Sequence, residues 1–115
     1  MKPYVEKIEI EAMFAEKSWG TYTVVDVQPG SMTVKISMKP NQQMSYHLHN
    51  HREEVWTVVS GTGKAIIDDE EKVIKTGDVI TVKAGCKHMV KATTALDMIE
   101  VQLGKEISVA DKIKF

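Results

Sequence analysis

The chain has 115 residues, with 15 basic and 16 acidic side chains and a formal charge of -1. Its length predicts a single domain, residues 1–115, and excludes a catalytic domain joined to a separate nucleotide-binding domain. The balanced charge gives no field that would favour a nucleic acid or an anionic membrane as a partner. No apolar run is long enough to cross a membrane and the N-terminus is unlike a signal peptide, so we expect a soluble, cytoplasmic protein.

The N-terminal residues 1–16 are interpreted as an arm. Within it, residues 6–16 are a candidate helix, although the pattern also suits a strand at residues 7–10. Segment 4–12 is a candidate for a strand exchanged between the subunits of a homodimer, because such an exchange would cover an exposed sheet edge.

Beyond the arm, short runs of alternating apolar and polar residues are separated by turn-forming residues such as Pro29-Gly30 and Gly61-Thr62-Gly63. This pattern is typical of an antiparallel all-β protein. Residues 110–114 suggest a C-terminal turn. So many short strands predict a small barrel or sandwich that closes on itself or pairs with a second copy. The expected strands are 21–27, 33–38, 44–49, 54–60, 64–68, 72–75, 79–82, 88–91 and 96–103.

Three of the four histidines lie within residues 47–51. Side chains alternate between the faces of a strand, so His47 and His49 would project from the same face, close enough to share one ion. Glu54 opens the next expected strand and His88 opens a later one, so four ligands could converge from three strands. The alternative is that these are surface imidazoles beside solvated carboxylates. Because the chain has one cysteine, any metal must rest on histidine and carboxylate.

The spacing of these residues resembles the paired motifs of the cupin superfamily. The first motif reads Pro40-Asn41-(x5)-His47-x-His49-(x4)-Glu54-(x6)-Gly61 and the second reads Gly77-(x5)-Lys83-Ala84-Gly85-(x2)-His88. The resemblance implies a single-domain double-stranded β-helix, or small jelly-roll barrel. It also implies one divalent metal ion held by His47, His49, Glu54 and His88. The chain departs from the family at Asn41 and Lys83, which are turn positions and not ligands.

A closer resemblance extends over nearly the whole chain from Lys17. It is carried by Trp19-Gly20-x-Tyr22, His49-x-His51-Arg52-x-Glu54-x-Trp56, Ala84-Gly85-x-Lys87-His88, Ile99-Glu100-Val101-Gln102-x-Gly104 and the terminal Asp111-x-x-Lys114-Phe115. These segments are similar to the isomerase domain of type II mannose-6-phosphate isomerase, usually the C-terminal part of a bifunctional mannose-1-phosphate guanylyltransferase. The resemblance implies metal-dependent interconversion of mannose 6-phosphate and fructose 6-phosphate, without the guanylyltransferase activity.

The expected ligand set suits this chemistry. Aldose-ketose isomerisation produces an enediolate, whose negative charge a metal with open coordination positions stabilises. Imidazole and carboxylate ligands suit zinc, manganese, iron, cobalt or nickel, so the residues do not select one metal. If the ion were iron, the same open positions would admit dioxygen. Loss of His47 is expected to empty the site.

Candidate substrate-binding residues are Arg52 and Lys114. Arg52 is the single arginine and lies inside the first motif, where it either contacts a phosphate or pairs with Glu53 or Glu54. The family pattern has arginine at the positions of Lys17, Lys35, Met89 and Lys114. Lysine can still hold a phosphate as a point charge, whereas methionine cannot.

Glu100 and His51 are the candidate catalytic bases. Glu100 and Gln102 alternate with apolar residues, so Glu100 is either an inward-facing base or a solvated side chain, and the solvated interpretation is preferred. His51 is expected on a loop beside the ligands. The leading hypothesis is a homodimeric sugar-phosphate isomerase. The alternatives are a cupin that binds a small ligand without turnover and an iron-dependent oxygenase.

Overall fold

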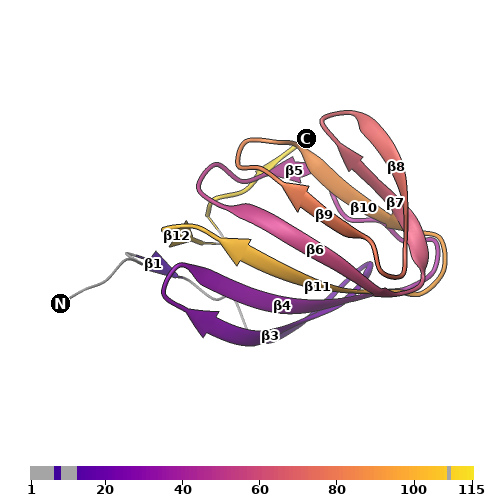
Figure 1. The fold of residues 1–115 in the computed structure, drawn as a ribbon, viewed down its shortest axis with the longest axis horizontal. Helices are drawn as coiled ribbons and strands as arrows, with labels where there is room; N and C mark the ends of the chain where they lie inside the picture. The colour runs from indigo at the N-terminus through magenta and orange to yellow at the C-terminus, as the bar shows by residue number, and fades with distance from the viewer. Residues whose placement is uncertain (1–6, 9–12, 109) are drawn as a thin grey trace.

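The computed structural model describes residues 7–8, 13–108 and 110–115, and this part of the chain consists of strands and their connections (Figure 1). No helix that could cross a membrane occurs among these residues. The strands are β1 Lys7–Ile8, β2 Phe14–Lys17, β3 Gly20–Gln28, β4 Ser31–Met38, β5 His47–Leu48, β6 Glu53–Ser60, β7 Thr62–Ile67, β8 Glu70–Lys75, β9 Val79–Val82, β10 His88–Ala92, β11 Leu96–Leu103, β12 Glu106–Ile107 and β13 Ile113–Lys114. The expected all-β architecture is confirmed.

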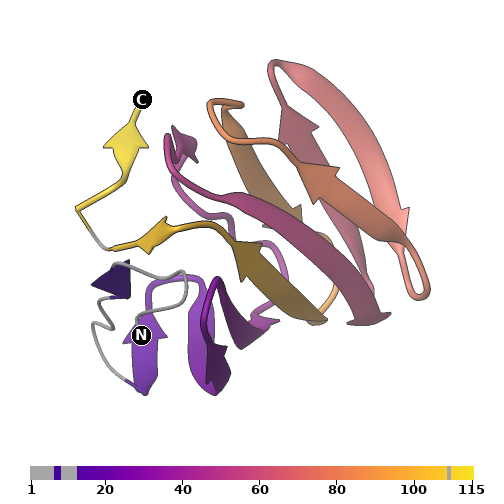
Figure 2. The same cartoon turned by 60° about the vertical axis from the view of Figure 1, so that its left-hand side comes forward.

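Two antiparallel sheets face each other. The larger sheet has the order β2-β3-β4-β11-β6-β9, and the smaller has the order β13-β5-β10-β7-β8. The second view shows the two sheets on opposite sides of one interior (Figure 2). The C-terminal strand β13 lies beside the short purple strand β5, with which it pairs. A separate parallel pair joins β1 to β12 of the same chain. Every inner side chain of the two sheets therefore contributes to one interior.

Strict alternation builds the core of this interior. On β4, Met32, Val34, Ile36 and Met38 are buried, while the residues between them are more exposed. Inward-facing β-branched and unbranched apolar side chains from both sheets remove apolar surface from water, which is the main favourable contribution to folding.

Strand β11 has a divided inner face. Its first inward residues, Leu96 and Met98, are fully buried apolar side chains, whereas the next two, Glu100 and Gln102, are buried and polar. The interior is therefore an apolar core toward one end of β11 and a polar chamber toward the other. This division determines where a functional site can form, because buried polar groups require partners.

Several predicted elements differ from the structure. The strand expected at 44–49 is reduced to His47–Leu48, and Gln43, just before the expected range, forms an isolated bridge to Lys91. The turn expected at 110–114 includes β13, whose residues pair with β5. Short strands β2 and β12 were not predicted as such. The proposed exchange of segment 4–12 falls on residues outside those described, apart from Lys7–Ile8.

One glycine is required where the chain passes from one sheet to the other. Gly61, between β6 and β7, has a φ of 94°, a conformation that side chains other than glycine rarely adopt. A Cβ atom there would also lie 2.0 Å from the carbonyl oxygen of Ala95. Any larger residue at this position would force the β6–β7 connection away from the β10–β11 connection, which contains Ala95.

Strand β11 offers a matched test of the core. Leu96 is fully buried, whereas Leu103 on the same strand is 36% exposed. We expect Leu96→Ala to lower the free energy of unfolding by about 2–5 kcal/mol, because it leaves a cavity, and Leu103→Ala to lower it by clearly less. Urea unfolding monitored by tryptophan fluorescence measures both. Equal losses would contradict this assignment of the inner face of β11.

Candidate metal centre

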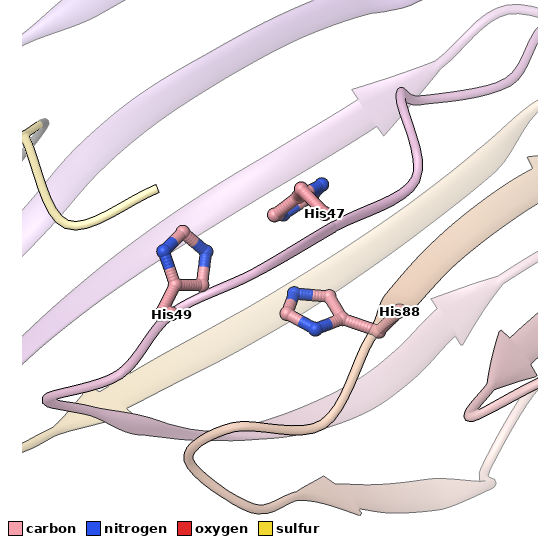
Figure 3. A group of neighbouring side chains, drawn as sticks. All are labelled: His47, His49 and His88. Atoms are coloured by element: carbon pink, nitrogen blue, oxygen red, sulfur yellow. The ribbon is translucent and has the colours of Figure 1, made fainter. Parts of the chain in front are cut away.

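Three of the predicted ligands come together on neighbouring segments. His47 on β5 pairs directly with His88 at the start of β10, and His49 follows β5. All three side chains are buried, and their ligand atoms lie within 4.8 Å of one another. Figure 3 shows His47 and His49 on one segment and His88 on the neighbouring one, with the three imidazoles close together. The alternative of surface imidazoles facing water is therefore wrong.

Backbone carbonyl groups determine the tautomer of each imidazole. His47 Nδ1 lies 2.7 Å from the carbonyl oxygen of Ser45, and His88 Nδ1 lies 3.0 Å from that of Cys86. His49 Nδ1 lies 2.5 Å from the carbonyl oxygen of Asp111. A carbonyl oxygen only accepts, so each Nδ1 donates the proton and each Nε2 keeps its lone pair. The Nε2 atoms are thereby the available ligand atoms.

Burial keeps two of these rings neutral. Burial, together with the nearby His88, lowers the pKa of His47 to about 3. Burial and the Arg52 guanidinium lower the pKa of His49 to about 4. Both imidazoles therefore have free lone pairs at neutral pH, and a metal would not have to displace a proton from either.

Glu54 points from β6 into the same space. Its Oε2 lies 3.4 Å from His49 Nε2, and its Oε1 lies 3.6 Å from His88 Nε2. Trp56 Nε1 donates a hydrogen bond of 3.0 Å to Glu54 Oε1, which fixes the carboxylate orientation. Burial alone would raise the pKa of Glu54, but Arg52 and the neighbouring imidazoles outweigh it and hold the pKa below its ordinary value.

The donor set fits a divalent metal. Within the described part of the chain, His88 Nε2 is a buried acceptor without a hydrogen-bond partner, and it faces an ionised carboxylate that is also an acceptor. Two ligands about 2.1 Å from one ion at usual coordination angles lie about 3.0–3.4 Å apart, close to the separations of Glu54 from His49 and His88. A cation between these atoms would remove the repulsion of facing lone pairs.

Arg52 supplies a positive charge beside these groups. Its Nε and Nη2 donate to Glu54 Oε2 at 3.0 and 2.8 Å, and its Nη2 lies 2.9 Å from His49 Nε2. Of the two predicted carboxylate partners, Arg52 therefore pairs with Glu54, while Glu53 pairs with Lys83. The guanidinium thus lies at the wall of the chamber, directly beside the predicted ligands.

Glu100 faces inward, so the preferred solvated interpretation is wrong. The side chain is 7% exposed and accepts a hydrogen bond of 2.7 Å from Gln102 Nε2. Burial and the charge of Glu54, with which Glu100 shares a hydrogen bond, raise the pKa of Glu100 above its ordinary value. A hydrogen bond between two carboxyl groups needs a proton, and the raised pKa places that proton on Glu100.

These residues line an open cavity of about 160 Å³. A cavity of about this size accommodates a benzene-sized group. Three cationic side chains, Lys17, Arg52 and Lys112, contribute to its wall. His51 and Lys114 do not line it: His51 is exposed on the loop after β5, and Lys114 is exposed on β13.

Lys112 and Asp111 are residues that the sequence analysis did not assign to the site. Lys112 lies in the C-terminal segment, and partial burial together with Lys114, Lys17 and Arg52 lowers its pKa. The terminal segment has no strand periodicity that would place it beside β5. Its proximity to the histidines arises from pairing across the fold, which leaves no signal in local sequence.

Comparison with known proteins identifies the family. The family model described as Mannose-6-phosphate isomerase C-terminal matches residues 7–115. The chain belongs to this family. It is 32% identical over 101 residues to mannose-1-phosphate guanylyltransferase of Escherichia coli, which covers 86% of this chain and 21% of that protein. It is 31% identical over 124 residues to mannose-1-phosphate guanylyltransferase ManC of Salmonella typhimurium, which covers 100% of this chain and 26% of that protein.

The chain thus spans about a quarter of the length of these curated relatives. Among solved structures, a protein of Klebsiella pneumoniae with a double-stranded β-helix domain matches with a TM-score of 0.72 and 22% identity, over 80% of this chain and 75% of the other. An RmlC-like cupin of Shewanella frigidimarina matches with a TM-score of 0.69 and 22% identity, over 84% and 81%. These likenesses confirm the cupin fold expected from the paired motifs that contain the histidines and Glu54.

The buried carboxyl pair predicts a pH-dependent stability. The unfolded chain releases the Glu100 proton near pH 4, whereas the folded chain retains it to higher pH, so folding stability falls as pH rises above that value. We expect Glu100→Gln, which mimics the protonated acid, to remove this loss. In chelator-treated protein, its stability relative to the wild type is expected to grow by about 1 kcal/mol or more between pH 5 and 8.

The matched control is Glu53→Gln on the same sheet, because Glu53 lies beside Glu54 in sequence but pairs with an exposed lysine. Urea unfolding at several pH values measures both variants. A wild-type minus Glu100→Gln difference that stays constant with pH would contradict the assignment of a shared proton to this pair.

Proposed function

We propose that this chain is a divalent-metal-dependent isomerase that interconverts mannose 6-phosphate and fructose 6-phosphate. The observation that carries the proposal is the meeting of three Nε2 lone pairs with an ionised buried carboxylate beside a cavity with cationic residues in its wall. Membership of the mannose-6-phosphate isomerase C-terminal family supports this assignment. The guanylyltransferase name of the longer relatives is not extended to this chain.

In this proposal His47, His49, Glu54 and His88 hold one metal ion. When bound, the ion supplies a Lewis acid that stabilises negative charge on the oxygens of an open-chain sugar. Zinc, manganese, cobalt, nickel and iron all suit three imidazoles and a carboxylate. Trp56 supports the site by orienting Glu54 through its indole N–H and by packing against His88, with ring centroids 5.7 Å apart.

Glu100 is proposed to move the proton between the two reacting carbons. It lines the cavity, and the hydrogen bond that it accepts from Gln102 Nε2 orients its carboxyl group. The pKa of this carboxyl group is raised toward neutral pH. A group with such a pKa can both accept a proton from the substrate and return it. His51, which is exposed on the loop, is less well placed for this role.

The substrate phosphate is proposed to bind among the cations of the cavity wall. Arg52, whose Nε and Nη2 already donate to Glu54, adds a positive charge and its remaining N–H groups, and Lys17 and Lys112 add point charges. The lowered pKa of Lys112, which follows from burial and then from repulsion by Lys114, Lys17 and Arg52, indicates that these cations lie close enough to repel one another. An anionic group of the substrate would relieve that repulsion.

The first test separates the metal ligands from a neighbouring histidine. We expect His47→Ala to lower affinity for Zn²⁺, Mn²⁺ or Co²⁺ by at least about 10- to 100-fold, because changes around metal ligands already have effects of this size. His51→Ala, which removes an exposed imidazole four residues away in sequence, is expected to bind metal like the wild type. Titration calorimetry on chelator-treated protein measures both.

A coupled assay on the reconstituted protein then tests turnover. Conversion of mannose 6-phosphate with zinc, manganese, cobalt or nickel supports the isomerase. Oxygen-dependent turnover that requires iron would instead support an oxygenase. A metallated protein that is silent on hexose and pentose phosphates with each metal would contradict the isomerase and leave a ligand-binding cupin.

Two lysines of the C-terminal segment give a matched test of phosphate recognition. We expect Lys112→Ala to raise KM for mannose 6-phosphate by about tenfold with a smaller change in kcat, because it removes one charge-assisted contact. Lys114→Ala is expected to have a smaller effect, since Lys114 does not line the cavity. Steady-state kinetics decide between them, and a larger KM effect at Lys114 would assign the phosphate contact to that residue instead.

A further inference from the structure

We propose that Asp111 is a positioning residue of the metal centre, which holds His49 in the tautomer and orientation that metal binding requires. The proposal rests on the metal-binding part of the proposed function. His47 and His88 donate their Nδ1 protons to carbonyl groups two residues earlier in their own segments. His49 instead uses a carbonyl group 62 residues away, that of Asp111. One ligand therefore depends on a remote part of the chain.

The Asp111 side chain fixes the loop that follows His49. Its Oδ1 accepts a hydrogen bond of 2.8 Å from the backbone N–H of Asn50, and its Oδ2 accepts one of 2.8 Å from that of His51. The residue is 8% exposed. Hydrogen bonds to a carboxylate largely removed from water are strong, so Asp111 and this loop are held in one relative position. That position places the Asp111 carbonyl oxygen on His49 Nδ1.

The rest of the C-terminal segment reinforces this arrangement. Ile113 pairs with Leu48 and Lys114 pairs with His47, so β13 lies along the strand that carries the ligands (Figure 2). The backbone N–H of Phe115 donates to the Tyr46 carbonyl oxygen at 2.9 Å. Segment 110–115 therefore contacts the region from Tyr46 to His51 along its length.

The loop is also confined from the side of β11. A Cβ atom on Gly104 would lie 2.3 Å from the His51 carbonyl oxygen, so only glycine permits this close approach. The loop between His49 and Glu54 thus lies between Asp111, which accepts its N–H groups, and the end of β11. Loss of the Asp111 carboxylate would remove the hydrogen bonds that hold the loop on one of these two sides.

The chemical consequence concerns a single proton. With an acceptor at Nδ1, the His49 proton stays there and Nε2 keeps the lone pair that faces Arg52 Nη2 in this structure and that a metal would use. Without that acceptor, the proton can occupy Nε2, where it blocks the lone pair that faces Glu54. The Asp111 side chain thus acts on the metal through His49 and the loop, without being a ligand itself.

The test uses Asp111→Ala and Asp111→Asn in the 115-residue chain. Long-range ¹H–¹⁵N spectra of chelator-treated wild type are expected to show His49 protonated at Nδ1, and those of Asp111→Ala to show protonation at Nε2. Affinity for Co²⁺, measured by calorimetry and by visible absorption of the bound ion, is expected to fall by about 10- to 100-fold. Asparagine keeps one acceptor oxygen, so Asp111→Asn is expected to recover part of both signals.

The matched control is Asp78→Ala. Asp78 Oδ2 also accepts a backbone N–H, that of Lys75 at 2.9 Å, but it does so in the turn between β8 and β9, away from the cavity lining. This variant is expected to lose some stability while keeping the wild-type His49 tautomer and Co²⁺ affinity. If Asp111→Ala does not fold, the Asp111→Asn variant provides the same comparison.

The readouts separate the two proposals. Wild-type tautomer and wild-type Co²⁺ affinity in the Asp111 variants would overturn the positioning role. A changed affinity with an unchanged His49 tautomer would also overturn it, because the loss would then be only structural. Failure of the wild type to bind any divalent metal would overturn the proposed metal centre, whereas the spectra of the chelator-treated variants would still decide whether Asp111 controls the His49 proton.

Discussion

The interior of this protein is organised around buried lone pairs that carry no proton. Three imidazoles hold their protons on Nδ1 against backbone carbonyl groups, and their other nitrogens share a chamber with the carboxylate of Glu54. Burial makes protonation of His47 and His49 unfavourable, so near neutral pH both rings stay neutral and supply no positive charge to balance the Glu54 carboxylate. The site therefore favours a cation for two reasons: the ligand side chains are present, and backbone hydrogen bonds keep the imidazole protons on Nδ1.

Much of this arrangement is readable from the sequence, because it rests on alternation. The spacing of His47 and His49 places both on one face of a strand, and the short period of the remaining runs predicts the two sheets. Glu54 shares the inward face with Trp56 and Val58, as its position two and four residues before them indicates. These inferences depend only on which face a residue occupies, and strand geometry determines that directly.

The errors arise where a choice between faces or a remote contact decides the outcome. Glu100 lies on a strand with apolar residues on one face and polar residues on the other, and alternation alone does not say which face is inside. In the structure Ile99, Val101 and Leu103 form the outer face, and Glu100 and Gln102 are the buried ones. Lys112 and Asp111 reach the site through the pairing of β13 with β5, which involves residues more than 60 apart. No local sequence pattern predicts this contact between distant segments.

The divided inner face of β11 makes folding and chemistry inseparable in this chain. Leu96 and Met98 anchor the core, while Glu100 and Gln102, further along the same strand, furnish the chamber wall. Slippage of β11 by one residue against its neighbours would turn all four side chains outward together. A partly folded molecule with β11 out of register would thus lack both the apolar core contacts of this strand and the polar side chains of the chamber. The chamber therefore forms only in chains whose central strand is paired in its native register.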